Sequence, residues 1–251
     1  MQDKDLIFQA IGSIFGKVTF PENRKSAIVK VSGRNYPLYY LNERYSRIRF
    51  EAMKSQIEST GNHELRLIVY PKAIHFPNPE QPHQIAFHFV KYENNNNVKA
   101  FKKYDNLEFK LTGLWQFIPV CKIPCISVYR NFSPMQLEIV KKLSLPRKVE
   151  FMKAKHLPLF WKDAPIPPFQ YNPTLEKEER GKPMFVSIKA KFQPHKNAFK
   201  FDSLLAMPQV EAPEYFKAGK ELKAEAMLAL KEVGSLGDDN HEDFGVNSVE
   251  R

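Results

Sequence analysis

Short apolar segments separated by turn residues dominate the first ninety residues of the chain. Between the third and fourth of them, Phe50, Met53 and Ile57 recur at spacings of three and four residues, and Gly61 follows. That period places the three side chains on one face of a helix, so we expect a helix over residues 43–59. The apolar segments themselves predict strands at residues 11–18, 27–31, 36–41, 64–70 and 85–90.

The order of three strands, a helix and two strands resembles the OB-fold, a five-stranded Greek-key barrel. The resemblance lies in the order and length of the elements over residues 6–92, since OB-folds share geometry rather than a sequence motif. It implies an OB-like β-barrel domain over residues 1–92. The polar run Asn94–Asn97 then predicts a linker over residues 93–105.

The second half of the chain partly repeats the first. Residues 8–12 and 109–113 both have the pattern F-x-x-x-G, and the apolar segments 65–71 and 184–194 each lead into a proline turn. These similarities favour a second β-rich, OB-like domain over residues 106–212 and a tandem repeat. A single larger β-rich domain is the alternative.

Three further segments complete the predicted fold. Ser133 and Pro134 are typical of a helix N-terminus, so a short helix is expected through Val140. Residues 157–173 contain five prolines, which favours a stiff aromatic surface loop that either wraps its own barrel or presents a partner site. An amphipathic helix is expected over residues 213–233, with Leu222, Ala226 and Leu230 on one face.

We therefore expect a mainly β (α+β) fold with two OB-like small β-barrels, a C-terminal amphipathic helix and a disordered acidic tail over residues 234–251. The whole chain carries a net charge of +10, although these last eighteen residues hold five acids and one arginine. The preceding part is more basic still. Such a surface attracts polyanions, namely nucleic acid, anionic lipid or an acidic protein; a solvated lysine-rich surface is the alternative.

The common enzyme motifs are missing from the sequence, among them the P-loop, the Rossmann glycine pattern and H-E-x-x-H. Cys121 and Cys125 form a C-x3-C pair, but no paired histidine spacing supplies two more zinc ligands. We therefore expect no cofactor and no metal, and we favour a non-catalytic protein, with an enzyme whose site has no recognisable motif as a further alternative. The N-terminus lacks the pattern of a secretory signal, and no apolar run is long enough to span a membrane, which favours the cytoplasm.

Basic and aromatic residues alternate in two regions, a mixture suited to single-stranded nucleic acid. Aromatic faces stack on bases and cations contact the phosphates, whereas packing in a core is the alternative role for each tyrosine. The first region spans fourteen residues from Tyr36 to Arg49. The candidate binding residues are Tyr36, Tyr40, Arg44, Arg47, Arg49, Trp115, Lys122, Tyr129, Arg130, Lys189 and Lys191.

The sequence thus favours non-catalytic binding of single-stranded DNA or RNA through a basic-aromatic surface. The alternative is a protein-interaction or assembly factor whose proline-rich loop and C-terminal helix bind an acidic protein partner. Neither the preference between DNA and RNA nor the oligomeric state follows from the sequence.

Overall fold

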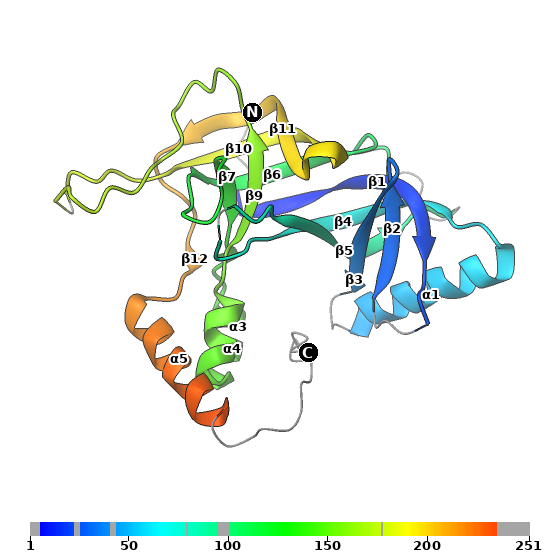
Figure 1. Ribbon diagram of the computed structural model, residues 1–251, viewed down its shortest axis with the longest axis horizontal. Coiled ribbons are helices and arrows are strands. Elements are labelled where there is room, and N and C mark those ends of the chain that lie inside the picture. The colour runs from blue at the N-terminus through cyan, green and yellow to red at the C-terminus, as the bar shows by residue number, and fades with distance from the viewer. Residues whose placement is uncertain are drawn as a thin grey trace.

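The computed structural model describes residues 6–22, 26–40, 44–78, 80–94, 101–176 and 178–234 (Figure 1). Over these residues the chain is mainly β with four α-helices. The strands of the first half are β1 (Gln9–Thr19), β2 (Ala27–Val31), β3 (Arg34–Tyr40), β4 (Glu64–Ile74) and β5 (Gln84–Tyr92). Those of the second half are β6 (Glu108–Gln116), β7 (Cys125–Val128), β8 (Arg130–Asn131), β9 (Lys155–Phe160), β10 (Met184–Gln193), β11 (Ala198–Gln209) and β12 (Tyr215–Phe216). The helices are α1 (Arg44–Thr60), α3 (Pro134–Lys142), α4 (Leu145–Phe151) and α5 (Lys220–Gly234).

The strands of the first half close into a five-stranded β-barrel, here called the first ring. The pairing runs β1-β2-β3-β5-β4 and returns to β1, with β3 and β5 parallel and the other pairs antiparallel. Its helix α1 follows β3, as the spacing of Phe50, Met53 and Ile57 predicts, and all three side chains are buried. The predicted order of elements is confirmed for this half.

Five strands of the second half also pair in a closed order, here called the second ring. The pairing runs β6-β7-β9-β11-β10 and returns to β6, with β9 and β11 parallel. The two rings join where β1 pairs with β6, since Gln9 lies opposite Thr112 and Gly12 opposite Phe109. β1 therefore belongs to the first ring through its pairing with β4 and touches the second through β6.

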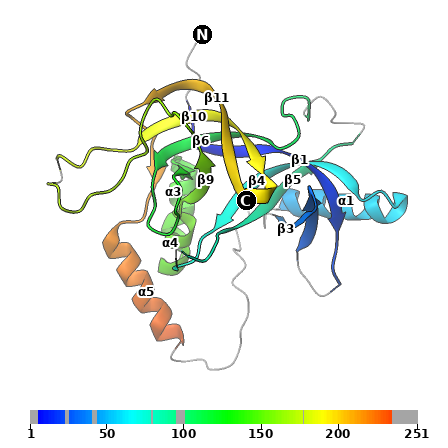
Figure 2. The ribbon, with the colours of Figure 1, turned by 45° about the horizontal axis from the view of Figure 1, so that its top comes forward.

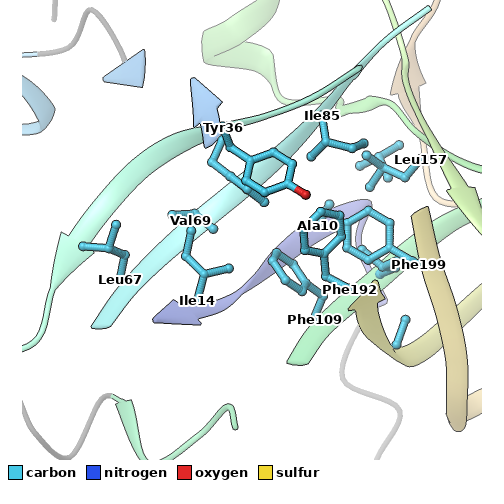
Figure 3. Packing of buried hydrophobic residues seen from close by; sticks show 14 of the residues in the cluster. Ala10, Ile14, Tyr36, Leu67, Val69, Ile85, Phe109, Leu157, Phe192 and Phe199 are labelled. Atoms are coloured by element: carbon cyan, nitrogen blue, oxygen red, sulfur yellow. The ribbon is translucent and has the colours of Figure 1, made fainter. Parts of the chain in front are cut away.

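One hydrophobic cluster runs through both rings. At their junction five aromatic rings contact one another with centroid distances between 5.1 and 6.4 Å. The first ring contributes Tyr36 and Phe87, and the second contributes Phe109, Phe192 and Phe199. Figure 3 shows four of these residues, Tyr36, Phe109, Phe192 and Phe199, gathered beside the aliphatic side chains.

The proline-rich segment departs from the sequence expectation at its start. Residues 157–160 belong to strand β9 rather than to a loop, and Pro158 lies opposite Cys125 of β7. Pro158 has no backbone N–H to donate to the sheet. The next residue supplies a hydrogen bond between the strands, with Leu159 N donating to Pro124 O at 2.9 Å. Beyond β9 the segment wraps its own ring as far as Phe169, whose N and O bond Trp115 O and Phe117 N.

The helices of the second half lie together on the side away from β11 (Figures 1 and 2). Ser133 caps α3 as predicted, accepting a hydrogen bond from Gln136 N at 3.2 Å. α5 begins at Lys220, later than expected, because Tyr215–Phe216 form β12 and pair with β8. α4 packs against α5. The predicted acidic tail lies outside the described residues except for Gly234, which ends α5.

Close approach of neighbouring backbones requires glycine in the first strand of each ring. A Cβ on Gly16 would lie 2.4 Å from Lys30 O of β2, and one on Gly113 would lie 2.5 Å from Ser127 O of β7. Because the obstacle is backbone in a paired strand, neither contact is relieved by a side-chain movement.

We expect Gly113→Ala to lower the free energy of unfolding by about 1–3 kcal/mol, the usual cost of overpacking a core. Urea denaturation followed by tryptophan fluorescence measures it. Gly219→Ala is the matched control, since a Cβ there meets no atom within 4 Å. Equal stability of the two variants would contradict the close approach.

Candidate nucleic-acid interface

Two of the predicted aromatic binding residues lie in the core. Tyr36 is 3% exposed and Trp115 is 1% exposed. The Tyr36 hydroxyl donates to Pro194 O at 3.1 Å, and Trp115 Nε1 donates to Ile166 O at 3.2 Å. Their polar atoms are thus satisfied inside the protein, and neither ring presents an open face to a base.

The other two predicted aromatics are half-buried. Tyr40 packs against Phe50 of α1 with a ring-centroid distance of 5.0 Å. Tyr129 lies between Phe8 and Tyr215, with centroid distances of 5.7 and 4.6 Å. Burial raises the pKa of Tyr129 above its ordinary value. Both tyrosines therefore contribute mainly to packing.

The predicted cations of α1 lie on the first ring. Arg47 and Arg49 are exposed, whereas the side chain of Arg44 lies outside those described. Arg49 lines a depression of about 360 Å³ together with Lys91 and Tyr92 of β5 and two neighbouring residues. This depression is about half open to solvent, whereas a small-molecule site encloses most of its ligand.

The predicted lysines of the second half lie elsewhere. Lys122 is exposed and pairs with Glu80 at 2.6 Å, while Lys189 Nζ lies 3.3 Å from the buried Glu108 carboxylate. Lys191 is exposed on β10. Figure 1 places α1 at the lower right and β10 at the upper left, so the structure does not bring the predicted residues together on one surface.

One predicted residue, Arg130, belongs to a different group of basic and aromatic side chains, here called the basic face. Its members come from β3, β4, β5, β8 and β9 and so span both rings. They are Tyr39, Lys72, His88, Arg130 and Lys155.

The first-ring part of the basic face is set by strand register. Tyr39 lies opposite His88 across the parallel β3–β5 pair, and their rings are 5.7 Å apart. Lys72 Nζ lies over the Tyr39 ring at 5.9 Å from its centroid. All three side chains are half-buried, so each keeps an accessible part.

The second-ring part is held by α4 and β7. The Arg130 guanidinium lies over the Phe151 ring at 4.2 Å, and its Nε donates to Phe151 O at 2.9 Å. Lys155 begins β9 opposite Val128 and is half-buried.

The cations of the basic face act on one another. The pKa of Lys155 is lowered to about 8, first by burial and then by the charges of Arg130 and Lys72. The pKa of His88 is lowered to about 3 by burial and by the charges of Lys155, Lys72 and Arg130. Among the described residues, no carboxylate forms an ion pair with Lys72 or Lys155. Within the described part of the chain, Lys72 and Lys155 therefore add positive charge that no ion pair with a carboxylate offsets.

Sequence reasoning missed most of this group because its members are far apart along the chain. Lys72 and Lys155 are separated by more than eighty residues, and neither stands in a run of basic residues. The one available signal was Tyr39, whose alternation with Tyr36 and Tyr40 places it on the opposite face of its strand.

A second cluster also escaped the sequence analysis. The fold brings His75 and His83 to Cys121, with one donor atom of each residue within 4.8 Å of the others. Hydrogen bonding, first from Cys125, lowers the pKa of the Cys121 thiol. The spacing of His75 and His83 in the sequence does not predict this cluster. The two histidines lie in a loop, where side chains follow no regular period.

No known protein family matches the chain, and no curated protein is similar to it in sequence. None of the helices in the described part of the chain has the length and apolar character that a membrane span requires. Function must therefore be argued from the arrangement of the side chains.

His88 is half-buried and neutral in the folded protein, which predicts a loss of stability in mild acid. Its pKa is about 3 in the folded protein and about 6.5 when unfolded, so the unfolded chain binds the extra proton between these values. The free energy of unfolding should fall by about 1 kcal/mol between pH 6.5 and 5.5 from this residue alone. Urea denaturation across this range measures it.

His88→Gln removes one titrating group and should make that part of the pH profile less steep, while the slope due to His156, whose pKa burial lowers to about 4, remains. His63→Gln is the control, since His63 lies outside the basic face and is hydrogen-bonded to Val18 O at 2.8 Å. A His88→Gln profile as steep as that of the parent protein would contradict the assignment.

Proposed function

We propose that this protein binds single-stranded nucleic acid through the basic face without catalysing a reaction. The observation that carries the proposal is the convergence of Lys72, Arg130 and Lys155 around Tyr39 and His88, with no carboxylate paired to either lysine among the described residues. The partner is a polyanion whose phosphates replace the missing counter-charge.

Electrostatics favour an anionic partner over a purely structural role for these cations. Burial first, and then the like charges of Arg130 and Lys72, disfavour the charged form of Lys155, as its lowered pKa expresses. A phosphate placed between Lys72, Arg130 and Lys155 would attract all three cations and so offset their mutual repulsion. Phosphate neutralisation also releases counter-ions from the nucleic acid, which makes such binding strongly salt-dependent.

Tyr39 favours a nucleic acid over a simple anion. Tyr39 is half-buried with Lys72 beside its ring, and the accessible part of the ring offers a surface for base stacking, which is worth about 1–3 kcal/mol per base. Stacking tolerates any base, so we expect little sequence preference. Because a base must leave its own stack to lie on Tyr39, we expect a single strand rather than a duplex.

The fold supports this proposal by analogy. The pairing order of the second ring matches that of the first, with the third and fifth strands parallel in each. Gly16 and Gly113 occupy corresponding places, since each lies in the first strand of its ring against the second. We infer two OB-like barrels related by duplication, and OB-folds are frequent binders of oligonucleotides.

Removing two cations should weaken binding in a salt-dependent way. We expect Lys155→Gln combined with Arg130→Gln to reduce affinity for a labelled single-stranded oligonucleotide about tenfold or more at low salt. The slope of log affinity against log salt should fall by about one for each lost contact. Fluorescence anisotropy with DNA and with RNA measures both quantities.

Lys141→Gln is the matched control, because Lys141 is exposed on α3 and already pairs with Glu138 at 2.6 Å. Equal losses in the control and the double variant would indicate a diffuse charge effect. Absence of oligonucleotide binding by the parent protein at low salt would overturn the proposal.

The pH dependence of binding tests Lys155 by itself. Its pKa of about 8 means that the free protein loses this charge as the pH rises from 7 to 9, so affinity should fall over that interval. Lys155→Arg stays protonated throughout and should give a flat profile. Identical profiles for the two proteins would exclude Lys155 from the contact.

The alternative function, protein interaction or assembly, has one observation in its favour. Met227, Leu228 and Leu230 of α5 are each more than half exposed. Exposed apolar side chains on one helix are typical of a protein-binding surface. This reading predicts a complex that persists at high salt and is lost in Leu230→Lys, whereas oligonucleotide binding depends on salt and on the basic face.

A further inference from the structure

Two loops from different rings meet beside the aromatic junction. The connection between β4 and β5 carries His75 and His83, and the connection between β6 and β7 carries Cys121. Cys125 is the first residue of β7 and is fully buried. One donor atom each of His75, His83 and Cys121 lies within 4.8 Å of the others, close to the separation of ligands around a bound metal ion.

Backbone carbonyls determine which histidine nitrogens are available. His75 Nε2 lies 2.7 Å from His156 O, and His83 Nε2 lies 2.8 Å from Asn197 O. Because a carbonyl only accepts hydrogen bonds, both Nε2 atoms carry the hydrogen and both Nδ1 atoms keep a lone pair. A carbonyl that holds the far nitrogen of a histidine ring is the usual support of a metal ligand.

The Nδ1 atom of His75 is buried and has no hydrogen-bond partner among the described residues. A buried acceptor without a partner costs free energy, so its persistence requires an explanation. A cation in the cluster would supply one, since Nδ1 is then a ligand rather than an unsatisfied acceptor.

The two cysteines supply the sulfur. Both are free thiols and both are buried. Cys125 Sγ donates to Ile123 O at 3.6 Å and lies next to Cys121, but it is outside the group of three donor atoms that are all within 4.8 Å of one another. The C-x3-C spacing falls within the range found in zinc sites.

We propose that His75, His83, Cys121 and Cys125 bind one zinc ion that joins the first ring to the second. Two imidazoles and two thiolates form a common tetrahedral zinc set, and their mixed nitrogen and sulfur character suits a borderline cation. His75, His83 and Cys121 already share one spacing, and Cys125 completes the set by a movement of its side chain toward them. With four protein ligands no position is then open to water, so the ion is structural. This inference does not depend on nucleic-acid binding.

Metal content gives the first test. Protein purified without chelator and under reducing conditions should hold about one zinc per chain by elemental mass spectrometry. After zinc is replaced by cobalt, visible absorption should show thiolate charge transfer and the strong d–d bands of a tetrahedral site. Cys121→Ser and His75→Gln should lose most of the metal and alter these bands.

His195→Gln is the matched control, because His195 is an exposed histidine on the neighbouring turn. It should keep the metal and the cobalt spectrum of the parent protein. Parent protein without bound metal and without cobalt bands after reduction would overturn the proposal, as would copper in place of zinc. A Cys121–Cys125 disulfide found by mass spectrometry of the protein as purified from cells would also overturn it.

Thermal unfolding gives a second readout that needs no variant to bind metal. A chelator should lower the melting temperature of the parent protein and of His195→Gln by several degrees, since zinc binds only the folded site. It should leave Cys121→Ser unchanged. Equal shifts in all three proteins would overturn the proposal even if all of them contained zinc. Oligonucleotide is absent from these measurements, so their outcome is separate from that of the binding experiments.

Discussion

Burial of Tyr36 at the junction of the two rings is the contact on which the other features of the structure depend. The aromatic side chain of Tyr36 packs against Phe87 of the first ring and against Phe192 of the second ring. Tyr36 therefore joins the two halves of the core. A buried hydroxyl requires a partner, and this one donates to Pro194 O in the β10–β11 turn. The same turn contains Asn197, whose carbonyl bonds His83 Nε2. The hydrogen bond of the Tyr36 hydroxyl therefore helps to hold the β10–β11 turn of the second ring against the β4–β5 loop of the first ring.

The two candidate sites follow from that arrangement. With the rings held together, β4 and β9 are neighbours, and Lys72 of one acts on Lys155 of the other. The β4–β5 loop reaches the β6–β7 loop, and His75 meets Cys121. Neither group of residues exists within one ring alone. In the function proposed above the basic face would bind a polyanion, whereas the lone-pair donors of the histidine–cysteine cluster would bind a metal ion.

The two sites would have different effects on the protein. A zinc ion held by four protein groups would lock the relative position of the rings, because its ligands come from loops of both. A polyanion at the basic face would instead offset a repulsion that the folded chain tolerates. Stability would come from the first site and function from the second, and both would depend on the same aromatic junction.

The sequence by itself determined the local structure of the first half. Three features depend only on near neighbours in the chain: strand alternation, the spacing of Phe50, Met53 and Ile57, and the Ser133 cap. Each of them is found as predicted. The candidate site was decided only by the tertiary structure. Whether Tyr36 is a binding residue or a core residue depends on a second ring more than 150 residues away, and alternation along one strand cannot reveal that. Likewise Lys155 and His75 acquire their neighbours through strand pairing and loop contacts, which bring distant residues together without any regular spacing in the sequence.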